Sequence, residues 1–130
     1  MSLPSLLGFV VTGLQAHPLC ENVAVIETRA FSPDQFFLKV RAELPDSHRL
    51  QVRIYFNRGH TDYAYQLFTT EPLLRWDNKE EFRHLPSFPH HYHDDKGNVL
   101  PSLLNGNAIV DLQIVLTEIS GYFLRRAHGG

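Results

Sequence analysis

Histidine and aspartate are crowded into one short stretch of this 130-residue chain. Four of its eight histidines fall within ten residues and two aspartates follow at once, which gives the set His84, His90, His91, His93, Asp94 and Asp95. Imidazole and carboxylate groups are good ligands for zinc and similar ions, so the candidate metal ligands are His90, His91, His93 and Asp94. No HExxH motif or spaced CxxC pair fixes a geometry, and histidines of a proline-rich loop can equally bond backbone groups or face water.

The same histidines could instead act as general acids and bases, because imidazole exchanges protons near neutral pH. That chemistry suits the attack of an RNA 2′-hydroxyl on its adjacent phosphate without a metal, which we favour slightly over metal-dependent cleavage. A cation must hold the phosphate, and the guanidinium fork of Arg75 matches phosphate oxygens. Asp77 could orient a histidine. The predicted catalytic residues are therefore Arg75, Asp77, His84, His90, His91 and His93, with no cofactor expected and a divalent metal as the alternative.

The segment around Arg75 also has a purely structural interpretation. A lone tryptophan such as Trp76 is most often a core anchor, and Asp and Asn commonly build turns by bonding their own backbone. We favour the structural role for Trp76 and Asn78, and leave both roles open for Arg75 and Asp77.

The elements that must position these residues follow from hydrophobic periodicity. Apolar residues three and four apart predict one helix over about 3–16 and another over about 107–124, the second with Asn107 as its N-cap. Alternation of apolar and polar residues predicts strands between about 22 and 76. We therefore expect an α+β fold, an antiparallel meander of four to five strands with the N-terminal and C-terminal helices packed on one face.

A proline- and histidine-rich connection over about 77–106 separates the last predicted strand from the second helix. It lacks periodicity over about thirty residues, and loops of that length in compact domains are usually functional or disordered. Its aromatic and proline content favours an ordered loop. We therefore expect functional residues in this connection before any other part of the chain.

One face of the predicted sheet is basic and aromatic. Alternation places Lys39, Arg41, Arg53 and Tyr55 on the side away from the core, and Arg58 lies in the turn that follows. Basic surfaces with aromatic rings hold single-stranded RNA through phosphate contacts and base stacking. The same composition suits an interface with another protein, so both interpretations stay open.

Composition, length and charge limit the classes of protein to which the chain can belong. The chain is 43% hydrophobic and 20% charged, as globular proteins are, and its length fits a single domain over 1–130. A single cysteine, Cys20, excludes an intrachain disulfide and is typical of a cytoplasmic protein. The net charge of −2 restricts any nucleic-acid surface to a local patch. The apolar run LLGFVVTGL is too short to cross a bilayer, so no membrane contact is expected.

The order of several segments resembles that of a known family of bacterial toxins. The order DYAYQLF, LLRWDN, HLPSFPHHYH and NVLPS, followed by an amphipathic helix, is similar to the TumE family of toxin–antitoxin modules. The resemblance covers about Ile26 to Ile119, and its distinctive parts are Arg75 to Asn78 and Pro86 to His93. The chain departs from the family pattern at residues 79–82, KEEF, where members often carry a proline and histidines.

The resemblance implies a cytoplasmic, growth-inhibiting toxin that is neutralised by a small helix-turn-helix antitoxin. We accordingly predict the toxin of a type II system that acts on RNA or translation, with a homodimer as one assembly state. The RNA target rests on analogy with small toxins in general. The alternative function is a non-catalytic, partner-binding or metal-stabilised regulatory module.

Overall fold

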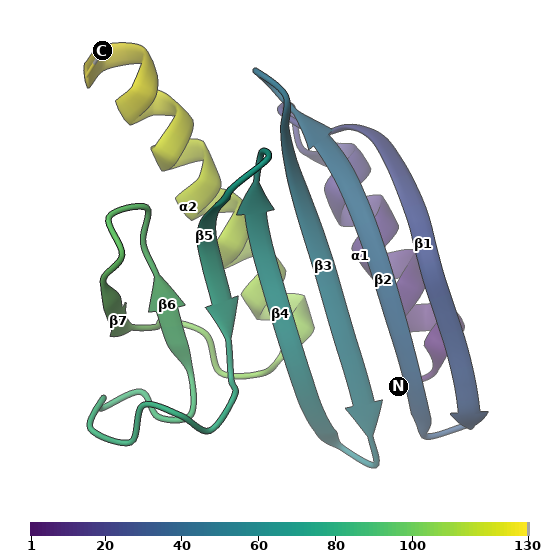
Figure 1. Ribbon diagram of the computed structural model, residues 1–130. Helices are drawn as coiled ribbons and strands as arrows, with labels where there is room; N and C mark the ends of the chain where they lie inside the picture. Colours follow the sequence, from purple (N-terminus) through teal and green to yellow (C-terminus); the bar gives the residue numbers. More distant parts are fainter. Residues whose placement is uncertain (130) are drawn as a thin grey trace.

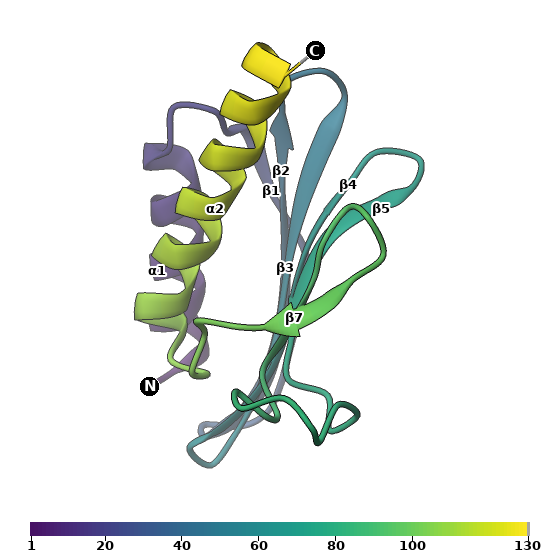
Figure 2. The same cartoon turned by 90° about the vertical axis from the view of Figure 1, so that its left-hand side faces the viewer.

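The two sequence periodicities produce two layers, a sheet and a pair of helices. A computed structural model describes residues 1–129 and places both helices against one face of a single antiparallel sheet (Figures 1 and 2). Its elements are α1 (Leu3–Ala16), β1 (Glu21–Ser32), β2 (Gln35–Leu44), β3 (His48–Asn57), β4 (His60–Phe68), β5 (Pro72–Asp77), β6 (His91–His93), β7 (Val99–Pro101) and α2 (Ala108–Gly129). The strands pair in chain order from β1 to β7. The α+β meander with terminal helices is thereby confirmed.

The predicted count of four to five strands was too low, because the segment over 77–106 contains two more. Strand β6 pairs with β5, and β7 pairs with β6, so the meander continues through the proline-rich connection. Each added strand has only three residues, which is too short for alternation to be recognised. The second helix also continues to Gly129, beyond the predicted end near 124.

Tight turns fix the register of the long central strands. Strands β3 and β4 are joined by Arg58 and Gly59, both with positive φ (51° and 89°). Two such residues form the turn whose twist matches that of a hairpin. The resulting register pairs Arg53 with Ala64. Because side chains alternate along a strand, this register decides which residues share the face away from the helices, called the open face below.

The core lies between the sheet and the helices. Alternate residues of β2 and β3, such as Leu38 and Ile54, are fully buried, and so is the apolar stripe of each helix, including Leu14 and Leu112. Trp76 of β5 is also buried, and its indole Nε1 donates a hydrogen bond to Glu118 Oε2 of α2 at 2.6 Å. Trp76 is therefore the core anchor that the sequence indicated.

The carboxyl group of Glu118 predicts a pH dependence of stability. Burial raises its pKa above the ordinary 4.5, against the opposing effect of the Trp76 hydrogen bond. Its contribution to the free energy of unfolding is then full in acid and is lost as pH rises through the raised pKa. Glu118→Gln cannot ionise at this position but can still accept from Trp76. When the pH falls from 8 to 5, we expect the free energy of unfolding of this variant to rise less than that of wild type.

Urea unfolding at the two pH values measures this difference. Gln in place of the exposed Glu80 is the matched control. If the free energy of unfolding rises equally in wild type and Glu118→Gln, the Glu118 carboxyl is not the source of the pH dependence.

Candidate functional site

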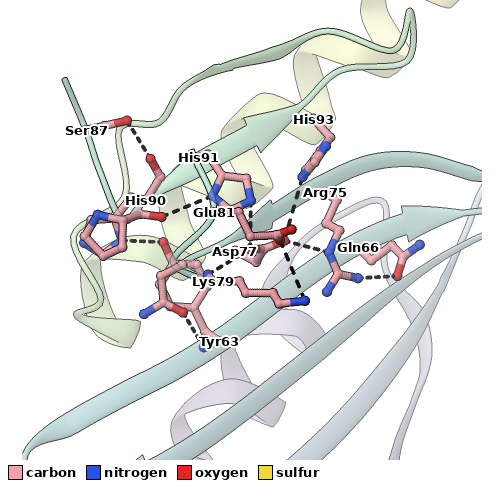
Figure 3. Close-up of polar contacts among 12 residues, drawn as sticks. Tyr63, Gln66, Arg75, Asp77, Lys79, Glu81, Ser87, His90, His91 and His93 are labelled. Carbon is pink, nitrogen blue, oxygen red and sulfur yellow. Dashed lines mark hydrogen bonds and ion pairs between the residues drawn. The ribbon is translucent and has the colours of Figure 1, made fainter. Parts of the chain in front are cut away.

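The pairing of β5 with β6 brings four of the predicted site residues together. Asp77 lies opposite His91, and Arg75 lies opposite His93. These residues alternate with the core-facing Trp76 and Tyr92, so their side chains emerge on the open face. We call Arg75, Asp77, His91 and His93 the open-face cluster (Figure 3).

Asp77 is the centre of the cluster. Its Oδ2 accepts a hydrogen bond from Arg75 Nε at 2.8 Å, and its Oδ1 accepts one from the backbone N–H of Lys79 at 3.0 Å. His91 Nε2 is 2.9 Å from Oδ1, and His93 Nε2 is 3.9 Å from Oδ2. Arg75 is held in turn by Gln66, whose Oε1 accepts from Nη1 at 3.1 Å. One buried carboxylate therefore organises three cationic or basic side chains.

The imidazole of His91 is buried and fixed in one orientation. Its side chain is only 1% exposed, and Nδ1 lies 3.1 Å from the carbonyl oxygen of Pro89. A carbonyl can only accept, so Nδ1 carries a hydrogen and Nε2 is the ring nitrogen that faces Asp77. Among residues 1–129, Nε2 has no hydrogen-bond partner, since the nearby Asp77 oxygen lies off the axis of the ring nitrogen.

His93 is the imidazole of the cluster that solvent reaches. Its side chain is 34% exposed. Burial lowers the pKa of His93 below 6.5. The ring is therefore neutral at pH 7, the form in which imidazole accepts a proton or binds a metal.

Phe82 covers the two histidines from the loop side. Its ring meets that of His91 edge-on at 4.7 Å between centroids and that of His93 at 5.8 Å. Phe82 belongs to the segment KEEF over residues 79–82. In this segment Lys79 and Glu81 form an exposed ion pair at 3.9 Å. This segment thus supplies an apolar cover for the cluster.

A hollow of about 220 Å³ adjoins the cluster on the open face. The register places Ala64 between Arg53 and Asp77, and the small methyl side chain leaves this space unfilled. The hollow is lined by Arg53, Tyr55, Asp62, Tyr63, Ala64, Arg75, Asp77, Asn78 and Lys79. A ligand in it would lie within reach of both Arg53 and Arg75.

Two cross-strand rows connect the cluster to the basic residues predicted to bind RNA. One row runs Lys39, Arg53, Ala64, Asp77 and His91, and the other runs Arg41, Gln51, Gln66, Arg75 and His93. Lys39 lies 3.9 Å from Glu27, and the Arg53 guanidinium lies over the ring of Phe37 at 5.3 Å. Tyr55 lines the hollow. Arg58 lies apart in the β3–β4 turn, 4.0 Å from Asp34.

Three other predicted residues lie outside the cluster. His90 points to the opposite side of β6, where its Nδ1 is 2.7 Å from the hydroxyl of Tyr63. His84 is exposed in the preceding loop. Asp94 closes its own turn by accepting from the backbone N–H of Lys96 and Asn98, and the hydrogen bonds from Asn98 contribute most to lowering its pKa. The structure therefore groups Asp77, His91 and His93 as metal-capable residues, in place of a set with His90 and Asp94.

Comparison with known proteins identifies the family. The family model described as Toxin TumE matches residues 12–123, which is most of the chain. The chain belongs to the TumE toxin family. Comparison with curated proteins and with solved structures gives no match. Membership of the TumE family implies a cognate antitoxin. Within residues 1–129, neither helix has the length and apolar content needed to span a membrane.

Several residues of this TumE-family site were missed by sequence reasoning. Ala64 forms the hollow, Gln66 holds Arg75, and Phe82 covers the histidines. Asn78, for which the sequence favoured a structural role, supports the start of β4, because its side chain accepts from the N–H of Tyr63 and donates to the carbonyl of Thr61. The register of the sheet would have indicated Ala64 and Gln66, since they lie opposite Asp77 and Arg75.

Proposed function

We propose that this protein is the toxin of a type II toxin–antitoxin module and that it inhibits growth by cleaving RNA at the open-face cluster. The observation that carries the proposal is the convergence of Arg75, Asp77, His91 and His93 at one end of the basic cross-strand rows. Phosphate-binding cations thus lie beside imidazoles, the pairing that phosphodiester cleavage requires.

The open face suits a single strand of RNA. Lys39, Arg41 and Arg53 offer positive charge to successive phosphates, while Phe37 and Tyr55 offer rings against which bases stack. The strand would follow β2 and β3 and bring one phosphate to the hollow beside Ala64. A local patch of this kind is compatible with the net charge of −2.

Arg75 and His93 are the members of the cluster that meet the scissile phosphate in this proposal. The Arg75 side chain is 40% exposed, so its outer nitrogens reach a phosphate while Nε holds Asp77. A guanidinium in that place stabilises the charge that develops on the phosphate oxygens. His93 brings an imidazole to the solvent-exposed side of the cluster beside Arg75. The buried His91 and Asp77 hold these two side chains in place.

The antitoxin we propose is a small helix-turn-helix protein that neutralises the toxin in the cytoplasm by direct binding. Its simplest mode of action is to cover the open face, because the arginines and aromatic rings that suit RNA also suit a protein partner. Such binding would shield the hollow and the basic rows together.

Induced expression of His93→Ala beside wild type tests the proposal. We expect wild type to stop growth with loss of cellular RNA, and the folded variant to permit growth, with purified His93→Ala cleaving RNA at least about 100-fold more slowly. His84→Ala is the matched control, since His84 is exposed and outside the cluster, and it should remain toxic.

Two results would contradict the proposal. A His93→Ala variant as toxic as wild type would remove the open-face cluster from the mechanism. A folded wild-type protein that binds its antitoxin but leaves RNA intact would favour the non-catalytic, partner-binding alternative.

A further inference from the structure

The buried nitrogen of His91 faces a carboxylate in a way that calls for a cation between them. The contact with Pro89 fixes the ring so that Nε2 lies only 2.9 Å from an Asp77 carboxylate oxygen, yet the two atoms make no hydrogen bond. A buried ring nitrogen without a hydrogen-bond partner is costly, because the site is shielded from water. We propose that Asp77, His91 and His93 bind a divalent metal ion, with Zn²⁺ favoured by their nitrogen and oxygen ligands.

The direction of the His91 contact distinguishes a metal from a proton. A proton shared by Nε2 and Oδ1 would lie near the line that joins them, as hydrogen bonds prefer. The Asp77 oxygen lies off the axis of the ring nitrogen, so Nε2 has no hydrogen-bond partner within residues 1–129. A metal bonded to both atoms at about 2.0–2.2 Å produces this off-axis arrangement, because it lies on the lone-pair axis and the oxygen lies beside it.

The spacing of the three ligand atoms fits one ion. All of them lie within 4.8 Å of one another. Atoms bound to the same Zn²⁺ are typically separated by about 3–3.5 Å, given metal–ligand bonds of about 2.0–2.1 Å. His91 and Asp77 are already near that separation, and a rotation of the partly exposed His93 ring would bring its Nε2 closer to them.

The surroundings also match those of a metal centre. A ligating histidine usually donates its other ring N–H to a carbonyl or carboxylate, as His91 does to Pro89. Three protein ligands leave a fourth position for water or a phosphate oxygen. Arg75 donates to Asp77 Oδ2, while Oδ1 accepts from the Lys79 N–H and has a second lone pair for a metal beside His91. The charge of Arg75 weakens metal binding by repulsion.

Zinc titration of the purified, chelator-treated protein tests the inference. We expect calorimetry to show one Zn²⁺ per chain with Kd of about 1 μM or tighter, Co²⁺ to give visible ligand-field bands, and Zn²⁺ to raise Tm. His93→Ala should bind Zn²⁺ at least about 10-fold more weakly, and His84→Ala should bind like wild type. His91→Gln, checked by circular dichroism, should also weaken binding.

Two outcomes would overturn the metal site. One is folded wild type that binds no Zn²⁺ or Co²⁺ up to about 1 mM, a concentration well above that of a built site. The other is equal affinity in wild type and folded His93→Ala.

The role of the metal in cleavage rests on the proposed function, whereas metal binding itself does not. Stoichiometric Zn²⁺ binding without RNA cleavage would keep the metal site and remove the ribonuclease. RNA cleavage by chelator-treated protein that binds no metal would keep the ribonuclease and remove the metal site.

Discussion

The Asp77→Asn variant is expected to lose toxicity although its shape is nearly unchanged. Asn retains an oxygen that accepts from the Lys79 N–H but loses the negative charge that faces Arg75, His91 and His93. RNA cleavage should fall by about 100-fold or more, because the charge both orients the cluster and binds the proposed metal. Induced growth, cleavage of RNA by the purified variant and zinc calorimetry measure the three effects.

The stability of Asp77→Asn separates a damaged site from a damaged fold. The free energy of unfolding should fall by about 1–3 kcal/mol, since a buried hydrogen-bond acceptor for Arg75 is weakened. A loss of that size leaves an ordinary domain folded, as urea unfolding would show. Asp95→Asn makes the same change at an exposed position nearby and should behave like wild type. Wild-type toxicity in Asp77→Asn would place the chemistry elsewhere.

The long elements of the fold could be predicted because each buries many residues at a regular interval. Both helices carry an apolar stripe, and strands β2 and β3 alternate buried and less buried residues along most of their length. Strands β6 and β7 carry no such signal. They form because the edge of β5 offers unpaired backbone groups, which is a tertiary effect that a local pattern does not contain.

The alternation of side chains along β6 decides which of the predicted site residues lie together in the structure. His91 and His93 are two residues apart on β6 and share the open face, whereas His90 faces the other way and bonds Tyr63. Asp94 follows the end of the strand and closes a turn. Once residues 91–93 are recognised as a strand, alternation alone selects His91 and His93.

The basic residues on the open face follow the same logic. Alternation in the sequence places four residues on the same face of the regular β2–β3 hairpin, namely Lys39, Arg41, Arg53 and Tyr55. Arg58 belongs to the turn and therefore does not join them. The hollow had no comparable signal, because it is produced by the small size of Ala64 among larger neighbours on adjacent strands.

Filling the hollow should stop RNA cleavage without disturbing metal binding. Ala64→Leu replaces a methyl group with a branched side chain directly opposite Asp77, where it would occupy the space between Arg53 and Arg75. The free energy of unfolding should change by less than about 1 kcal/mol, because the added atoms enter existing space instead of a packed core. RNA cleavage should fall at least about 100-fold, since a displaced phosphate loses its alignment with the cluster.

Ala30→Leu is the matched control for this variant, because it makes the same substitution on the exposed strand β1. It should cleave RNA like wild type, and both variants should bind Zn²⁺ with wild-type affinity, since neither residue is a proposed ligand. Full cleavage by folded Ala64→Leu would show that the phosphate does not enter the hollow. It would then have to approach from the side on which Arg75 and His93 line a second depression with Asp94 and Asp95. Those carboxylates would repel a phosphate, which is why we expect the approach through the hollow beside Ala64.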